Sequence, residues 1–154
     1  MENIKELQRL ADELFNGARI ELKSDPNFWK ERFRGKESCA GVYILRDQLD
    51  RIVYVGETRT IQHRVKDLLN THNHSFRRTV FKEFILNNEN YDFEIRNDYK
   101  KAKELIREYI CNEFTYSYLE VLLGRKELEE YIILEKKSEN LFNKIGNKKI
   151  LIKT

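Results

Sequence analysis

Two short apolar runs, residues 41–46 and 51–55, lie only four residues apart and constrain the fold of this chain most strongly. Both runs are rich in β-branched and aromatic residues, which favour extended strands. The interval 47–50 between them is polar and typical of a turn, so the sequence predicts an antiparallel hairpin. A glycine and a tyrosine accompany each run, in GVY at 41–43 and in YVG at 54–56, where Gly56 follows the second run. A plain hairpin requires none of these four residues.

Other segments predict a third strand and several helices around the hairpin. Large and polar residues alternate over 114–121, as in a half-buried strand that extends the hairpin sheet. The terminal stretch 149–152 is a further candidate edge strand. Apolar residues recur at helical spacing, or follow helix start signals, in 4–15, 27–33, 61–69, 75–86, 100–110 and 125–137. We therefore predict an α/β (α+β) fold with a small three-stranded antiparallel sheet flanked by helices.

The length and composition favour one folded domain. The chain has 154 residues, of which 36% are charged, with one proline and six glycines. Residues 1–36 match no known motif and form a predicted helical N-terminal extension, whereas 37–145 form the predicted core. The formal net charge of +3 indicates a slight preference for polyanionic partners. The N-terminus lacks the uninterrupted apolar core of a signal peptide and no run could span a bilayer, so we expect a cytoplasmic protein.

The hairpin motifs resemble those of the GIY-YIG nuclease family. GVY at 41–43 corresponds to the first half of that name and YVG at 54–56 to the second, with valine in place of isoleucine in each. The resemblance continues at Arg64, eight residues beyond Gly56, where the family carries its catalytic arginine on the helix after the hairpin.

Two later segments also resemble this family. The helix from 125 is similar to the one that bears the family's metal-binding glutamate, and Glu129 fits that position best. Glu130 is an alternative one residue later, because Ile133 and Leu134 could form its apolar pair. The stretch 140–143 resembles the apolar-aromatic-asparagine ending of the motif, with Asn143 as its asparagine, although the family's usual proline is missing.

The resemblance implies a GIY-YIG-like fold and a metal-dependent DNA endonuclease whose products carry 5′-phosphate and 3′-hydroxyl ends. Its catalytic set would be Tyr43, Tyr54, Arg64, Glu129 and Asn143. Tyr43 would activate water, directly or through water held by the cation. Tyr54 would orient the attacking group or a phosphate, Arg64 would stabilise the phosphorane-like charge, and Glu129 would hold Mg²⁺ (or Mn²⁺). We favour a restriction-type enzyme over a repair or mobile-element nuclease. The rivals are a non-cleaving nucleic-acid-binding module of the same fold and a protein-interaction domain.

The chemistry of phosphodiester hydrolysis suits these residue types. The reaction needs an activated water, a positive group near the phosphoryl oxygens and a Lewis acid at the departing oxygen. The pKa of a tyrosine is ordinarily about 10, so Tyr43 needs a nearby cation or hydrogen bond to act as a base near neutral pH. Arg64 or a metal-bound water could supply that charge or hydrogen bond. A single carboxylate fits magnesium, which keeps several waters and binds substrate phosphates.

Basic side chains on two predicted helices are candidate DNA contacts. Arg77, Arg78 and Lys82 form a basic face in the helix 75–86, and His63 precedes Arg64 at the expected rim of the cleft. Such charged faces can also simply meet water. Homodimerisation is a further way in which the protein could gain DNA specificity.

Overall fold

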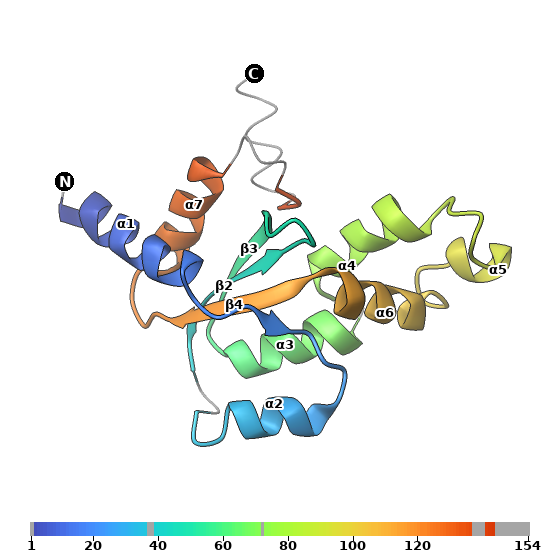
Figure 1. Ribbon diagram of the computed structural model, residues 1–154, viewed down its shortest axis with the longest axis horizontal. Helices are drawn as coiled ribbons and strands as arrows, with labels where there is room; N and C mark the ends of the chain where they lie inside the picture. Colours follow the sequence, from blue (N-terminus) through green and yellow to red (C-terminus); the bar gives the residue numbers. More distant parts are fainter. Residues whose placement is uncertain (1, 37–38, 72, 137–140, 144–154) are drawn as a thin grey trace.

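The computed structural model describes residues 2–36, 39–71, 73–136 and 141–143, and it contains a four-stranded antiparallel sheet. The strands are β1 (Ile20–Glu21), β2 (Gly41–Arg46), β3 (Ile52–Thr58) and β4 (Thr115–Glu120), in the order β1-β4-β2-β3 (Figure 1). The predicted mixed fold, its hairpin and its third strand are confirmed. The predicted number of three strands is wrong, because the two-residue β1 pairs with β4 and is too short to show an alternating pattern. The candidate strand 149–152 lies outside the described residues.

The helices follow the predicted order with two differences. They are α1 (Glu2–Phe15), α2 (Pro26–Arg32), α3 (Ile61–Asn70), α4 (Ser75–Val80), the π-helical η1 (Phe81–Ile85), α5 (Phe93–Arg96), α6 (Lys103–Glu113) and α7 (Arg125–Glu135). The single helix predicted over 75–86 is thus an α-helix that continues as a π-helical turn. The unpredicted α5 has only four residues, and the Asp92 side chain caps it by accepting from two backbone N–H groups.

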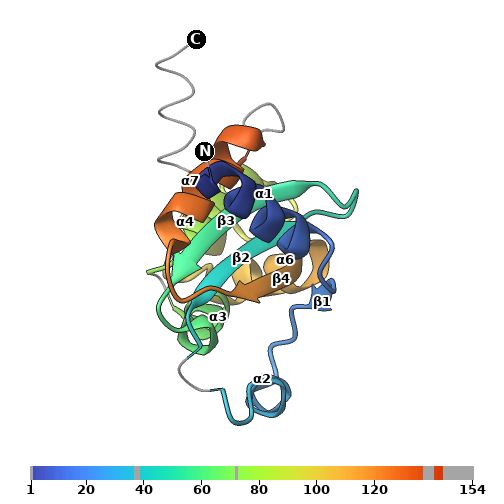
Figure 2. The same ribbon diagram turned by 90° about the vertical axis from the view of Figure 1, so that its left-hand side faces the viewer.

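Helices cover both faces of the sheet, and the site residues come from both sides. Figures 1 and 2 show α1 and α7 together on one side, where Leu14, Leu128 and Ile132 pack with Val42 and Ile44. On the opposite face, α3, α4 and α6 pack against Tyr43 and Leu45. Every residue of the central strand β2 is buried as a result. None of the described helices has the length and apolar character needed to cross a lipid bilayer.

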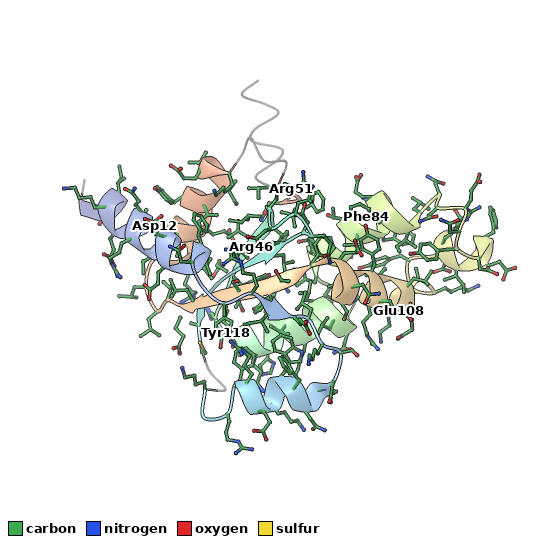
Figure 3. All side chains as sticks on the ribbon, in the orientation of Figure 1. Asp12, Arg46, Arg51, Phe84, Glu108 and Tyr118 are labelled. Carbon is green, nitrogen blue, oxygen red and sulfur yellow. The ribbon has the colours of Figure 1, made fainter. Side chains whose placement is uncertain are left out.

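A buried arginine ties the N-terminal segment to the sheet. Arg46 lies in the interior of the molecule, whereas Arg51 lies at the hairpin tip (Figure 3). The side chain of Arg46 is 2% exposed and donates to Ser117 Oγ at 2.8 Å and to the backbone carbonyl of Phe15. Ser117 Oγ in turn donates to the carbonyl of Ala18. The end of α1 and the residues that follow it are therefore built into the sheet.

Candidate active site

The register of the hairpin places both motif tyrosines on one face. Tyr43 pairs with Gly56 and Leu45 pairs with Tyr54. Because directly opposed residues share a face and side chains alternate along a strand, Tyr43 and Tyr54 point to the same side. Their ring centroids are 6.2 Å apart, and Tyr43 also stacks on Tyr116 of β4 at 5.4 Å. The two phenols thus belong to one aromatic layer under α3 and α4.

The two motif glycines allow close approaches that a side chain would prevent. A Cβ at Gly56 would lie well inside 3.0 Å of the Tyr43 ring and hydroxyl. The Tyr43 ring therefore lies across Gly56, and its hydroxyl reaches toward the outer edge of β3. A Cβ at Gly41 would collide with the backbone carbonyl of Leu119 in β4. The glycines in GVY and YVG are explained by packing around Tyr43 and β4.

Arg64 and Glu129 reach the two phenols from opposite sides of the sheet. Arg64 extends from α3 with its side chain 29% exposed. Glu129 extends from α7 on the other face and is half-buried beside the end of β3, where the backbone N–H of Glu57 interacts with it. The Tyr43 phenol interacts electrostatically with Tyr54, Arg64 and Glu129. Both Arg64 and Glu129 are therefore close enough to Tyr43 and Tyr54 to interact with them electrostatically.

The environment of Tyr43 keeps its hydroxyl neutral. Burial, followed by the neighbouring Tyr54, raises the pKa of Tyr43 well above its ordinary value, and the opposing effect of Arg64 is smaller. Burial also raises the pKa of Tyr54. In the free protein, the cost of desolvating a phenolate exceeds the stabilisation by the Arg64 guanidinium. A Tyr43 phenolate formed with the help of a bound cation stays a prediction.

A bound cation would stabilise the ionised form of the Glu129 carboxylate. Burial and the nearby Glu57 raise the pKa of Glu129, so its ionised form lacks sufficient positive compensation. Glu57 itself pairs with Arg125, whose Nε lies 3.2 Å from the Glu57 carboxylate. Hard oxygen donors in excess negative charge suit Mg²⁺ or Mn²⁺. Glu130, the alternative one residue later, is exposed and is absent from the groups that affect either tyrosine, which favours Glu129.

Asn143 lies next to the catalytic set and is held by the backbone of β3. Its Oδ1 accepts from the N–H of Val55 at 2.9 Å, and its Nδ2 donates to the carbonyl of the same residue. The side chain is 8% exposed. Both ends of the Asn143 amide thus bond the backbone of Val55, between Tyr54 and Gly56. This arrangement stabilises the strand. A direct catalytic role for Asn143 stays a prediction.

The basic residues divide into one structural arginine and three exposed groups. Arg77 is 0% exposed and donates to the carbonyls of Leu68 at 2.9 Å and Lys103 at 3.1 Å. It cannot meet a phosphate at the surface, so the prediction that Arg77 contacts DNA is wrong. The sequence alone does not show which of the adjacent arginines faces the core, so the inward orientation of the Arg77 side chain could not be predicted from it. Arg78, Lys82 and His63 are exposed, and their contact with DNA stays a prediction.

Sequence reasoning missed two residues that bind the motif tyrosines. His74 Nε2 lies 2.8 Å from the Tyr43 hydroxyl, and Ser75 Oγ lies 2.9 Å from the Tyr54 hydroxyl. Both residues stand at the start of α4. The available signal was a histidine-serine pair immediately before an apolar helical stretch, which indicates a helix cap but not which side chains the cap would touch.

The sequence of this chain is similar to those of known proteins. Residues 39–144 match the family model described as the GIY-YIG catalytic domain. A segment of 88 residues is 33% identical to UvrABC system protein C of Gloeobacter violaceus (strain ATCC 29082 / PCC 7421), covering 56% of this chain and 13% of that relative. The chain thus spans only a small part of the length of the relative. No solved structure matches significantly. Because the family model covers more than half of the sequence and includes all five predicted catalytic positions, the chain belongs to the GIY-YIG family.

Proposed function

We propose that this protein is a divalent-metal-dependent DNA endonuclease that hydrolyses phosphodiester bonds to 5′-phosphate and 3′-hydroxyl ends. The observation that carries the proposal is that Tyr43, Tyr54, Arg64 and Glu129, from four different elements, lie close enough to interact electrostatically. Two phenols, a guanidinium and a half-buried carboxylate are the groups that orient water, neutralise phosphoryl charge and hold a cation. Packing alone gives no reason to place the guanidinium and the carboxylate beside the same buried phenol.

Each side chain has a role that its surroundings support. Arg64 donates to the phosphoryl oxygens and stabilises the charge that grows on them in the transition state. Tyr54, held by Ser75, orients a phosphate oxygen or the attacking water. Glu129 binds the cation, and Mg²⁺ or Mn²⁺, when bound, supplies a Lewis acid for the departing oxygen.

Tyr43 orients the attacking water by a hydrogen bond. Because burial keeps its hydroxyl neutral in the free protein, Tyr43 acts as a general base only where DNA and the cation lower its pKa. The proposed activity belongs in the cytoplasm and fits a restriction-type enzyme, with a repair or mobile-element nuclease as the alternative biology. A homodimer would present two such sites to a duplex.

The test is the cleavage of supercoiled plasmid by purified protein with Mg²⁺. We expect nicked or linear product from the wild type and from Glu130→Ala, the matched control for an exposed acid in the same helix. We expect about a hundredfold or greater loss of rate for Glu129→Ala and for Tyr43→Phe, and no product with excess EDTA. Equal rates for the wild type, Glu129→Ala and Tyr43→Phe would refute the assigned roles. Mapping of the product ends checks the predicted 5′-phosphates.

The rival module that binds nucleic acid without cutting it predicts a different result. It would shift DNA in a salt-sensitive manner, because phosphate contacts release counterions, and it would yield no product with any divalent cation. The half-buried Glu129 argues against this rival, since a module that only binds a polyanion gains nothing from a desolvated carboxylate beside the phenols.

A further inference from the structure

The start of α4 holds both motif tyrosines through two adjacent side chains. His74 binds the hydroxyl of Tyr43 and Ser75 binds that of Tyr54, at 2.8 and 2.9 Å. His74 is 0% exposed, and its ring also lies against the rings of both tyrosines, with centroids 6.1 and 5.6 Å away. A buried imidazole beside a catalytic phenol could act in either of two opposite ways, as a base that takes the phenol proton or as a donor to the phenol oxygen.

The second ring nitrogen of His74 decides between these two roles. Its Nδ1 accepts a hydrogen bond from the backbone N–H of Phe76 at 3.1 Å, which makes His74 the N-cap of α4. A nitrogen that accepts from a backbone N–H carries no proton. Burial, followed by the charges of Arg64 and Arg77, lowers the pKa of His74 well below its ordinary value, so the imidazole is neutral. A neutral imidazole carries one N–H, and here it must be at Nε2.

We propose that His74 is a positioning residue that donates its Nε2–H to the Tyr43 hydroxyl oxygen and does not act as a base toward it. The inference deepens the proposed function, on which it rests for the catalytic importance of Tyr43. With one lone pair of its oxygen engaged by His74, Tyr43 must turn its own proton away from the imidazole. Tyr54 and Arg64 also interact with the Tyr43 phenol, and Arg64 offers only donors. His74 thereby sets the direction in which Tyr43 can donate.

The protonation state of His74 can be measured directly by ¹⁵N nuclear magnetic resonance. Spectra of the free protein without metal or DNA at neutral pH distinguish a protonated Nε2 from a protonated Nδ1. We expect an unprotonated Nδ1 and a protonated Nε2. A proton on Nδ1, or a doubly protonated ring, would overturn the proposal. This measurement needs no nuclease activity, so it decides the hydrogen-bond direction even if the proposed function fails.

Replacement of His74 by asparagine separates the two contacts of this side chain. Asparagine is a good N-cap, so His74→Asn can keep the bond from the Phe76 N–H, but it is too short to reach Tyr43. We expect a cooperatively folded protein with a lower thermal midpoint, because the buried Tyr43 hydroxyl loses its donor, together with a kcat lower by about a hundredfold and a KM that changes little. Wild-type cleavage by a folded His74→Asn would show that His74 only caps the helix, and would overturn the positioning role.

A double-mutant cycle with Tyr43→Phe tests whether His74 acts through Tyr43. If it does, His74→Asn causes no further loss of kcat, and no further loss of stability, in the Tyr43→Phe background. Fully additive losses in both measurements would place the effect of His74 elsewhere and overturn the proposal. If the wild type itself cleaves no DNA, the proposed function fails, whereas the stability cycle and the spectrum still test the hydrogen bond.

Discussion

The half-buried position of Glu129 beside Glu57 has a cost for the stability of the fold. The folded-state pKa of Glu129 is raised by burial and by Glu57. A carboxyl with a raised pKa stabilises the folded state only where it is protonated, that is below its unfolded pKa of about 4.5, and this contribution is lost as the pH rises through the folded pKa. At neutral pH the ionised carboxylate therefore destabilises the protein without metal. A bound cation would reverse that effect.

We predict that Glu129→Gln stabilises the metal-free protein at neutral pH and abolishes cleavage. The expected gain in the free energy of unfolding is about 1 kcal/mol or less, since one pKa unit corresponds to about 1.4 kcal/mol. The gain should vanish below about pH 4.5, where the wild-type carboxyl is protonated in both states. Urea unfolding as a function of pH measures it, with Glu130→Gln as the exposed control. A Glu129→Gln variant that is less stable than wild type at neutral pH would contradict the prediction.

Mg²⁺ should also affect the thermal midpoints of the wild type and of Glu129→Gln differently. A cation that binds the folded wild type raises its thermal midpoint by mass action, and it should do so much less for Glu129→Gln. This measurement needs no DNA and no turnover.

At the residue scale, the sequence identifies the candidate catalytic residues better than it identifies the side chains that contact them. The letters of GVY and YVG identify Tyr43 and Tyr54, and the spacing identifies Arg64. The interactions that set their protonation lie outside the motif, in the burial of Tyr43 and in the contact from His74. Both depend on which loop folds over the phenols, and a single sequence does not specify that packing.

At the scale of elements, Arg77 joins three helices that surround the site. Extending from α4, it bonds the carbonyls of Leu68 in α3 and Lys103 in α6. The Leu68 carbonyl lies in the last turn of α3, where carbonyls lack partners within the helix. Its neighbour Arg78 faces solvent and lies over the Tyr99 ring at 5.9 Å. Adjacent arginines thus serve different purposes.

We predict that the two adjacent arginines have separable mutant effects. Arg77→Ala should lower the free energy of unfolding by about 2–4 kcal/mol, because it removes the donor to the Leu68 carbonyl at the end of α3 and opens a cavity. Arg78→Ala should change stability by less than about 0.5 kcal/mol. If α4 contacts DNA, Arg78→Ala should also weaken DNA binding and reduce its salt dependence. Chemical denaturation and fluorescence anisotropy make the comparison, and equal destabilisation by both substitutions would contradict it.

Elements with strong periodicity were the ones that the sequence predicted well. The helix α3 agrees with its pattern because one face is buried along its length, and the hairpin strands agree with their runs of β-branched and aromatic residues because both faces of β2 are buried. The π-helical turn η1 was missed because its apolar residues continue the stripe of α4 without a break. The strand β1 was missed because two residues establish no alternation. Short or irregular elements depend on their neighbours and leave little local signal.

At the scale of the whole molecule, the N-terminal segment completes the core. Ala11 and Leu14 of α1 are 0% and 1% exposed against the face of the sheet that α7 shares. β1 pairs with β4, and Trp29 of α2 stacks on Phe33 in the other core. The segment that was predicted only as a helical extension therefore supports both faces of the sheet and the helix that carries Glu129.

We predict that a chain beginning at residue 37 does not fold cooperatively. Its sheet would lose the β1 pairing and the cover over Val42 and Ile44, and several kcal/mol of burial energy would go with them, which is comparable to the whole stability of a small domain. Circular dichroism melting and dispersion of amide resonances check this. A sharp transition like that of the full chain would show that residues 1–36 are dispensable for folding.

Phe142 and Asn143 also have a consequence for how copies of this protein can meet. The N–H of Phe142 donates to the carbonyl of Val53, and the Asn143 amide satisfies both backbone groups of Val55. Along this part of β3, an asparagine side chain takes the place of a neighbouring strand. An incoming strand from another molecule would find these ladder positions already filled, so sheet-to-sheet polymerisation is blocked here. Two subunits that pair are therefore not expected to join through Val53 and Val55 of β3.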